Sequence, residues 1–475
     1  MVIPHRIQDG YGLSLHLLQQ AKEDGVDTIL TCDNGIAAID EIAWAKAQKM
    51  TVLVTDHHAV PFEEHEGRRT EKKSLADAVV NPHQQDCGYP YKELCGAGVA
   101  WNVIRVLYEN YDMDKREAED LLDFVAMATV CDVMSLTGEN RILVKEGLKR
   151  IRHTKNIGLQ ALMQACNVQP ENISAYHFGY VLGPCVNATG RLDTARHALR
   201  LFETGQETEA EEIARDLVDL NQERKELTLQ GVEMAKKLCE EGGYENDPVL
   251  VLFLPDVHES IAGLIAGRIR EMYNRPVFVL TRGEEGVKGS GRSTENYSMY
   301  ENMCGCAELF TKFGGHPMAA GLSLPEENVE KFRRKINENC PLTVEEVCPD
   351  IHIDMAMPVG YASTELVHQF ALLEPFGKDN PSPLFADRNL SISRMWLIGK
   401  NRNVLRMSVL SEYGQPVPGY FLWGMWRRCL HILPKSLVRK RWRMRCMEEK
   451  TGFYFLWCIQ QRLIFIREMK ICSWR

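Results

Sequence analysis

Two short apolar runs, each followed by acidic residues, constrain the fold of this chain more than any other feature. Thr28–Cys32 leads into the Asp33–Gly35 segment, and Thr51–Thr55 leads into the Asp56–His58 triplet, which reads Asp-His-His. An amphipathic stretch, Ile36–Lys49, separates the two runs. This order predicts strand, helix and strand, the right-handed βαβ unit of a parallel sheet, and therefore an α/β fold.

The polar residues after these runs predict a metal site. Parallel strands end at the same edge of a sheet, where ligands of open α/β sheets bind, so Asp33 should lie beside Asp56, His57 and His58. Carboxylates and imidazoles suit Mn²⁺ or Mg²⁺ better than a thiolate site would. A pair of surface histidines is the simpler alternative, but the second Asp on the neighbouring strand end favours the metal.

Asp132 is a further candidate ligand because it ends an apolar helical segment, Leu121–Val130. A buried carboxylate there is costly unless it is paired or coordinated. A cap at the helix end explains the same residue equally well.

Glycine-rich segments farther along the chain predict phosphate binding. We expect Gly183–Leu192, Lys288–Ser293 and Gly314–Gly321 to be loops, whose backbone amides and charged side chains can bond to phosphate oxygens. Structural loops and ordinary surface groups are the alternatives. They apply above all to the segment Gly183–Leu192 and to His258 and Arg268. The candidate substrate-binding residues are Arg191, His258, Arg268, Ser290, Arg292, Gly314, Gly315 and His316.

The pattern of elements divides the chain. Residues 1–205 begin as an α/β sheet domain and continue as helices, and residues 206–243 form a long polar connecting helix ended by two glycines. Residues 244–340 read as a second, smaller α/β lobe. Residues 345–420 turn to strands with one helix, the profile of a partial β-barrel of the OB-fold type.

Charge separates the last segment from the rest. Residues 421–475 carry 13 Lys and Arg against 3 Asp and Glu, a net +10, whereas the remainder carries −19. This segment also holds five of the eight Trp, and no strand alternation stands out from Phe421 onward. A basic, aromatic tail that touches nucleic acid is one interpretation. We favour the other, an aberrant tail translated out of frame.

Composition also predicts the cellular compartment. No apolar run is long enough to span a membrane, and the first residues lack the pattern of a signal peptide, so we expect no membrane partner. Fifteen Cys are scattered without a CxxC pair, which favours a reducing cytoplasm over a disulfide scaffold.

These motifs together resemble the DHH phosphoesterase superfamily. The resemblance rests on Asp33–Gly35, Asp56–His58, the Cys131–Met134 segment and the glycine-containing segments 183–192 and 314–321. Their order is similar to that in the RecJ family of single-strand-specific 5′→3′ DNA exonucleases, and Leu373–Pro381 resembles the segment that leads into that family's OB-fold domain.

The resemblance implies a function and a set of roles. Asp33, His57, His58 and Asp132 would be catalytic metal ligands, with Asp56 bound to the metal or just behind it, and Arg292 and His316 would hold substrate phosphates. Paired Mn²⁺ or Mg²⁺ ions would hydrolyse single-stranded DNA, with activity falling in mildly acidic buffer. Single-strand-binding protein and a helicase are the implied partners.

The chain departs from the family pattern at both ends. The family pattern has a first strand with an Asp-rich motif, and this sequence shows no such motif upstream of Asp33. The family pattern also continues with ordinary strands after Pro418, where this sequence has the basic tail instead. We therefore hypothesise an incomplete, C-terminally frameshifted copy whose hydrolysis is impaired. Two alternatives stay open: a DHH-type phosphodiesterase acting on short oligonucleotides or cyclic dinucleotides, and a non-catalytic DNA-binding scaffold.

Overall fold

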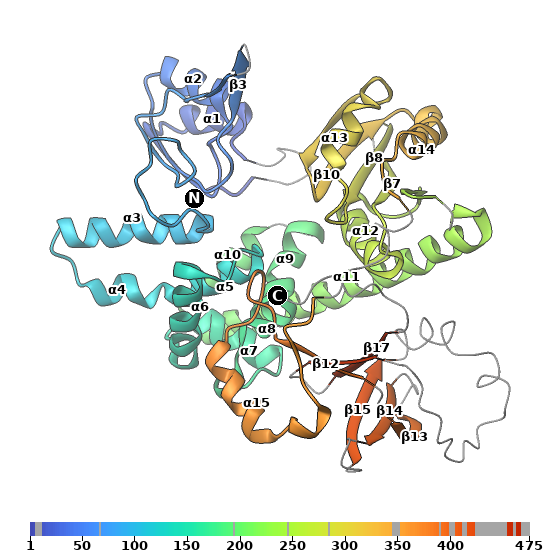
Figure 1. Ribbon diagram of the computed structural model, residues 1–475. Helices are drawn as coiled ribbons and strands as arrows, with labels where there is room; N and C mark the ends of the chain where they lie inside the picture. Colours follow the sequence, from blue (N-terminus) through green and yellow to red (C-terminus); the bar gives the residue numbers. More distant parts are fainter. Residues whose placement is uncertain are drawn as a thin grey trace. The chain divides into compact units, whose positions relative to one another are not determined.

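The computed structural model describes residues 1–4, 12–65, 68–192, 195–244, 247–283, 286–343, 352–388, 391–398, 404–410, 416–422, 454–458 and 462–466. The chain divides into two compact units (Figure 1). The first comprises Met1–Val347 with Gly377–Asp379, and the second comprises Cys348–Phe376 with Asn380–Arg475.

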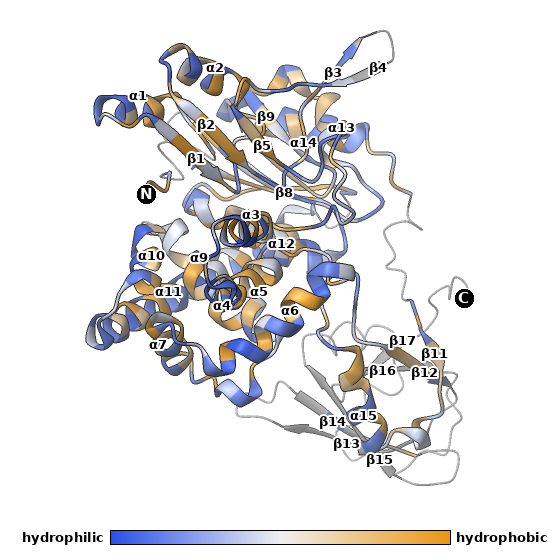
Figure 2. Ribbon diagram, turned by 90° about the vertical axis from the view of Figure 1, so that its left-hand side faces the viewer, coloured by the Kyte–Doolittle hydropathy of each residue, from blue (hydrophilic) through white to orange (hydrophobic). Residues whose placement is uncertain are grey.

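A small parallel sheet opens the first unit. Its strands are β1 (Thr28–Cys32), β2 (Thr51–Thr55) and β5 (Ala78–Val80), in the order β1-β2-β5, and α2 (Ile39–Ala47) connects the first two. The predicted bounds of β1 and β2 are confirmed. Val52 and Val54 of β2 are buried, and Figure 2 shows that strand coloured as hydrophobic along most of its length.

Helices surround and follow this sheet. Their bounds are α1 (Leu15–Glu23), α3 (Gly96–Asn110), α4 (Lys115–Asp120), α5 (Leu122–Cys131), α6 (Gly138–Arg150), α7 (Ile157–Ala165), α8 (Ala175–His177), α9 (Gly183–Leu192) and α10 (Ala195–Glu203). A short hairpin, β3 (Phe62–His65) with β4 (Arg68–Glu71), precedes β5. The predicted apolar helix ahead of Asp132 is confirmed as α5.

The prediction that residues 183–192 form a loop is wrong, because they form helix α9. Gly183 and Pro184 suggested a turn, but the chain stays helical without a break from α8 through residues 178–182 into α9, so both residues lie inside one helical segment. Cys185, Ala188 and Thr189 are buried at helical spacing, so packing of one face stabilises the helix.

The predicted connecting helix is confirmed as α11 (Glu207–Gly242), which ends where Gly243 adopts a left-handed conformation at φ 69°. Its first half contributes Ala210, Ala214 and Leu217 to the core formed with α5 and α7. Its second half contributes Val232 and Ala235 to a different core, formed with α12 (Glu259–Tyr273). One helix thus belongs to both lobes of the first unit.

The second lobe is built on a mixed five-stranded sheet of order β6-β7-β8-β10-β9. The strands are β6 (Leu250–Phe253), β7 (Val277–Gly283), β8 (Gly286–Arg292), β9 (Lys312–His316) and β10 (Ala319–Leu324), with helices α13 (Met299–Cys304) and α14 (Val329–Glu338). The glycine-rich segments expected as loops lie mostly in β8, β9 and β10, so that prediction is wrong. Close packing explains the glycines: a Cβ on Gly291 would lie 2.3 Å from the sulfur of Met299.

The second unit carries a seven-stranded sheet of order β11-β12-β16-β17-β15-β14-β13. Its elements are β11 (Met355–Ala356), α15 (Thr364–Phe370), β12 (Leu384–Arg388), β13 (Ser391–Ile398), β14 (Val404–Leu410), β15 (Pro416–Leu422), β16 (Tyr454–Cys458) and β17 (Arg462–Ile466). Strands β11 and β13 stand at the two edges, so the described strands do not close into a barrel.

The expectation of no strands from Phe421 onward is wrong, since β16 and β17 pair with each other and with β12 and β15. Aromatic residues predominate in β16 and Ile and Phe in β17, and these residue types favour strands. In the part of the chain that the structure describes, no helix is both long and apolar enough to cross a membrane.

Candidate metal centre

The carboxyl edge of the small sheet brings two strand ends together. Cys32 of β1 pairs in register with Thr55 of β2, so the next residues, Asp33 and Asp56, leave the sheet side by side. The amide of Asp33 donates to the Thr55 carbonyl at 3.0 Å, and Asp33 then turns out of the strand at φ 63°.

His57 lies between two carboxylates. Its Nε2 is 3.0 Å from Oδ1 of Asp33 and 3.4 Å from Oδ2 of Asp132, the residue that ends α5. The nitrogen is buried, yet neither carboxylate lies where an N–H group would donate, so Nε2 makes no hydrogen bond among the described residues. A buried ring nitrogen that faces two carboxylates without a hydrogen bond suits a bound cation.

Asp56 supports this arrangement from behind. Its side chain is 1% exposed, and its oxygens accept hydrogen bonds from the amides of Ile36 (2.9 Å), His57 (2.7 Å) and His58 (3.2 Å). Its Oδ1 also lies 2.7 Å from Nδ1 of His58. A carboxylate that holds one ring nitrogen leaves Nε2 of that ring available to a metal.

Three side chains offer converging donor atoms. The ligand atoms of Asp33, His57 and His58 all lie within 4.8 Å of one another, and among the described residues no other such cluster is found. Asp132 joins through its 3.4 Å approach to His57. Oxygen and imidazole donors fit Mn²⁺ or Mg²⁺, as the sequence predicts, and Asp56 is placed as the residue that orients His58.

The charges at this edge shift the titration of its groups. Burial lowers the pKa of His57, but Asp33 and Asp132 outweigh it and raise that pKa, while the bond to Asp56 raises the pKa of His58. Burial and the nearby charge of Asp33 raise the pKa of Asp132. Burial alone would raise the pKa of Asp56, but bonds from His58 and the backbone amides lower it.

The start of α3 also shapes the site, and the sequence reasoning missed it. A Cβ at Gly96 would lie 2.3 Å from Oδ1 of Asp33, so the Asp33 carboxylate rests directly against the first residue of this helix. Only glycine permits that approach. Two glycines at the start of an apolar helical segment, in Cys95–Val99, were the available signal.

A third strand end was missed as well. Asn81, 1% exposed, follows β5; its Nδ2 donates to the His58 carbonyl at 2.9 Å and its Oδ1 accepts from the His83 amide at 2.8 Å. It therefore fixes the backbone of His58. The apolar run Ala78–Val80 before Asn-Pro-His repeats the pattern of the first two strands and could have revealed it.

Five of the candidate phosphate-binding residues lie on β8 and β9, the two strands that flank β10. Arg292 of β8 and His316 of β9 both pair with Ala319 of β10, so they lie at the same end of the sheet. In the same way Ser290 and Gly314 both pair with Gly321. Gly315 pairs with Ala320, between these two sets of paired residues.

Three other predicted residues have different surroundings. Nδ1 of His258 accepts from the Ser260 amide at 3.3 Å and caps the start of α12. Arg268, exposed on α12, pairs with Glu271 three residues later. Each contact gives the residue a structural role without substrate. Arg191 lies in α9, but its side chain is outside the described residues.

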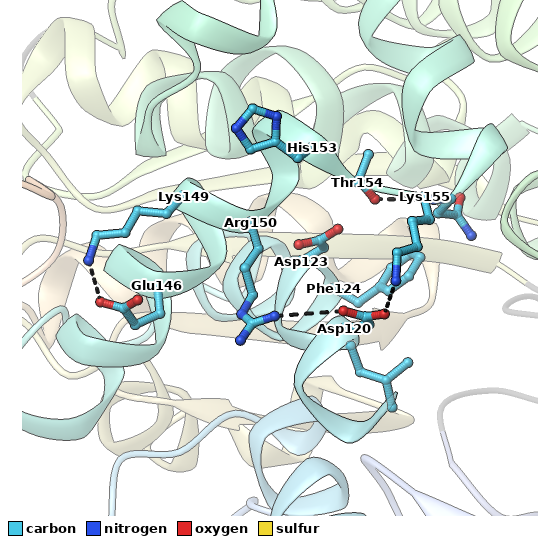
Figure 3. Close-up of a pocket in the computed structure, with 11 residues that line it drawn as sticks. Asp120, Asp123, Phe124, Glu146, Lys149, Arg150, His153, Thr154 and Lys155 are labelled. Atoms are coloured by element: carbon cyan, nitrogen blue, oxygen red, sulfur yellow. Dashed lines mark hydrogen bonds and ion pairs between the residues drawn. The ribbon is translucent and has the colours of Figure 1, made fainter. Parts of the chain in front are cut away.

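A cavity of about 590 Å³ opens elsewhere in the first lobe, at the opposite end of α5 from Asp132 (Figure 3). Its cations already have partners: Arg150 and Lys155 pair with Asp120, and Lys149 pairs with Glu146. The cavity is separate from the metal-binding edge. It is lined by Asp120, Leu121, Asp123, Phe124, Glu146, Lys149, Arg150, His153, Thr154, Lys155 and Asn156.

Comparison with family models assigns these regions to a known class. Residues 1–129 match the N-terminal domain of the DHH family, residues 246–340 match the DHHA1 domain, and residues 353–437 match the RecJ OB domain. The last match extends into the segment 421–475. Fold, metal edge and domain matches define a DHH-type protein with an added OB domain.

Sequence comparison with known proteins identifies the family within this class. The chain is 34% identical over 432 residues to the single-stranded-DNA-specific exonuclease RecJ of Haemophilus influenzae, covering 87% of this chain and 73% of the relative. It is 32% identical over 417 residues to RecJ of Bacillus subtilis, covering 51% of that protein. The chain belongs to the RecJ family.

A solved structure agrees with this assignment. The crystal structure of RecJ from Thermus thermophilus in complex with Mn²⁺ matches with a TM-score of 0.70 at 28% identity, over 86% of this chain and 60% of that one. The chain thus spans 51–73% of the length of these three relatives.

Proposed function

We propose that this chain hydrolyses single-stranded DNA from its 5′ end in a reaction that requires Mn²⁺ or Mg²⁺. The observation that carries the proposal is the buried Nε2 of His57, which faces Asp33 and Asp132 without a hydrogen bond. The RecJ relatives are named single-stranded-DNA-specific exonucleases, and one RecJ was crystallised with Mn²⁺.

The first-lobe residues would hold the metal and set its surroundings. Asp33, Asp132, His57 and His58 supply the ligand atoms, and Asp56 keeps Nδ1 of His58 as the protonated nitrogen so that Nε2 presents its lone pair. A divalent ion bound there activates water and stabilises the charge that develops at phosphorus. Asn81 and Gly96 fix the backbone and the space around these ligands.

The second-lobe residues would bind the strand. Arg292 would supply positive charge and His316 a ring nitrogen to phosphate oxygens, with Ser290, Gly314 and Gly315 near them in the same sheet. Arg191 stays a proposed contact from α9. His258 and Arg268 already have intramolecular partners, so we propose that they contribute little to substrate binding.

A long single strand is the substrate we favour over a dinucleotide. The match of residues 353–437 to the RecJ OB domain supports this choice, because OB folds grip several nucleotides of a single strand. A non-catalytic scaffold is disfavoured, since the donor atoms of Asp33, His57 and His58 still converge.

Labelled oligonucleotides test the proposal. We expect Mn²⁺-dependent release of mononucleotides from a 5′-labelled single strand, little cleavage of a blunt duplex, and no activity in EDTA. Asp33→Asn should abolish release, whereas Asp27→Asn, on the exposed residue before the other end of β1, should not. Release that starts at the 3′ end, or hydrolysis confined to dinucleotides, would contradict the proposal.

We further infer a cytoplasmic setting, with single-strand-binding protein and a helicase as partners. All ten cysteines characterised in the described residues are free thiols, which supports a reducing compartment. The partners rest on family resemblance alone. Co-elution of the purified chain with single-strand-binding protein on a sizing column would support that partner, and separate elution would count against it.

A further inference from the structure

Two exposed tyrosines stack on each other in the first lobe. Tyr176 belongs to α8, and Tyr180 belongs to the π-helix η3 (Phe178–Leu182) that continues it. Their ring centroids are 5.1 Å apart and their planes differ by 22°. Tyr176 and Tyr180 are 58% and 71% exposed, so the outer faces and edges of the stacked rings are open to solvent.

The backbone beneath the pair is firmly held. Phe178 and Leu182, on the opposite side of the π-helix, are fully buried in the helical core of the first lobe. Ser174 and His177 form a capping box at the start of α8, with His177 Nδ1 3.1 Å from the Ser174 amide. Single π-helical turns within α-helices are frequent at functional sites. The tyrosines therefore project from a rigid base.

This base packs against the helix end that carries Asp132. The thiol of Cys131, the residue before Asp132, donates to the Phe178 carbonyl at 3.4 Å. A Cβ at Gly183, just after the π-helix, would lie 2.3 Å from the Cys131 sulfur, so glycine is needed for this approach. The helical segment that carries the aromatic pair thus packs against the residue that precedes Asp132, one ligand of the metal edge.

We propose that Tyr176 and Tyr180 form a platform in the first lobe on which a nucleobase of the single strand stacks. The inference rests on the proposed function, which supplies single-stranded DNA as the ligand. Unpaired bases offer a free π-face that aromatic side chains bind without regard to sequence. Bases inside a duplex do not, so the platform would select unpaired strands.

A purely structural role is the competing explanation, because aromatic pairs four residues apart also stabilise isolated helices. The two roles make different predictions. A structural pair would influence unfolding and would bind every strand equally, whereas a platform discriminates strands with bases from strands without them.

Fluorescence anisotropy measures the binding of strands with and without bases, and EDTA prevents their hydrolysis during the titration. The full chain, the double variant Tyr176→Ala/Tyr180→Ala, the conservative variant Tyr176→Phe/Tyr180→Phe and the control Tyr111→Ala are titrated against labelled oligo(dT). The same proteins are titrated against an abasic strand of equal length. Tyr111 is 74% exposed at the end of α3, and it matches the pair in exposure. Circular dichroism and thermal unfolding verify the fold of each variant.

We expect the double alanine variant to bind oligo(dT) about tenfold more weakly and the abasic strand as the unmodified chain does. The phenylalanine variant, which keeps the rings, and Tyr111→Ala should bind both strands normally. Equal losses on both strands, no loss on oligo(dT), or no preference of the unmodified chain for oligo(dT) would overturn the platform.

These results separate the platform from the proposed function. Base-dependent binding without hydrolysis in Mn²⁺ would retain the platform and refute the nuclease. Normal hydrolysis with base-independent binding would retain the nuclease and refute the platform.

Discussion

The two sheets of the first unit present their candidate functional residues in different ways. In the sheet β1-β2-β5, Asp33, Asp56 and Asn81 follow the strand ends, and side-chain hydrogen bonds to the backbone fix Asp56 and Asn81. In the five-stranded sheet, Arg292 is the last residue of β8 and His316 is the last residue of β9. The two residues flank β10 at the same end of the sheet.

The difference reflects the chemistry asked of each region. A metal ligand must be held at a defined distance and protonation state, so carboxylates and amides behind it are needed. A phosphate contact requires charge and donors on an accessible surface. We therefore expect substitutions at the small sheet to act on metal affinity and turnover, and substitutions at the larger sheet to act on substrate affinity.

Among residues that are not proposed to bind the metal or that lie in the larger sheet, the largest effect should come from Asp56→Asn. The amide keeps the shape but turns one acceptor into a donor against the Ile36, His57 or His58 N–H groups, so His58 loses its orientation. We expect Mn²⁺ affinity to fall about 10- to 100-fold, as for other residues that orient ligands. Isothermal titration with Mn²⁺ measures this.

Asp77→Asn is the matched control, since Asp77 accepts a backbone bond from Val52 in the same sheet, away from the ligands. Comparable Mn²⁺ affinity in Asp56→Asn and the unmodified chain would show that the buried carboxylate does not support the site.

Acid should weaken metal binding next. The pKa values of His57 and His58 are raised without metal, so both rings hold protons to a higher pH than usual. Protonated imidazole cannot coordinate; affinity is therefore full above both pKa values and falls as pH decreases through them. We expect at least about a tenfold loss of Mn²⁺ affinity between pH 8 and pH 6. If the Mn²⁺ affinity does not change between pH 8 and pH 6, this result would contradict imidazole ligation.

A smaller effect is expected from Arg292→Lys in the larger sheet. Lysine keeps the charge but loses the forked donor geometry, so the KM for single-stranded DNA should rise about fivefold, the value of one hydrogen bond. Turnover and Mn²⁺ affinity should not change. Arg282→Lys on the adjacent strand β7, where Arg282 pairs with Glu326, is the control. A loss in turnover instead of KM would break the contrast between the two sheets.

The smallest effect should follow His258→Ala. His258 caps α12 through Ser260, so its loss should lower the free energy of unfolding by about 1 kcal/mol and leave KM unchanged. Urea unfolding and steady-state kinetics measure the two quantities. An increased KM at an unchanged free energy of unfolding would show that His258 contributes to substrate binding.

The same contrast explains how far the sequence alone could predict the molecule. Strands β1 and β2 were predictable because apolar runs with polar ends and a helix between them have few alternative folds. The convergence of Asp33, His57 and His58 followed from the parallel pairing of those strands. The long helix α11 was predictable from its charge pattern and its terminal glycines.

Other features depend on contacts that sequence patterns do not show. The glycines of β8 to β10 suggested loops, but they serve close packing within strands, as Gly291 does against Met299. Gly96 and Asn81 matter only because distant segments bring them to Asp33 and His58. The stacked tyrosines escaped notice because a π-helix has no sequence signal of its own.

Direct measurement of Mn²⁺ binding tests the central claim, that the edge of the β1-β2 pair is a metal centre. Electron paramagnetic resonance counts free Mn²⁺ during titration of the unmodified chain, of His57→Ala and of His153→Ala, a control on an exposed histidine at the other end of α5. We expect His57→Ala to lose at least about 100-fold in affinity and His153→Ala to bind normally. Equal binding by all three proteins would contradict the claim.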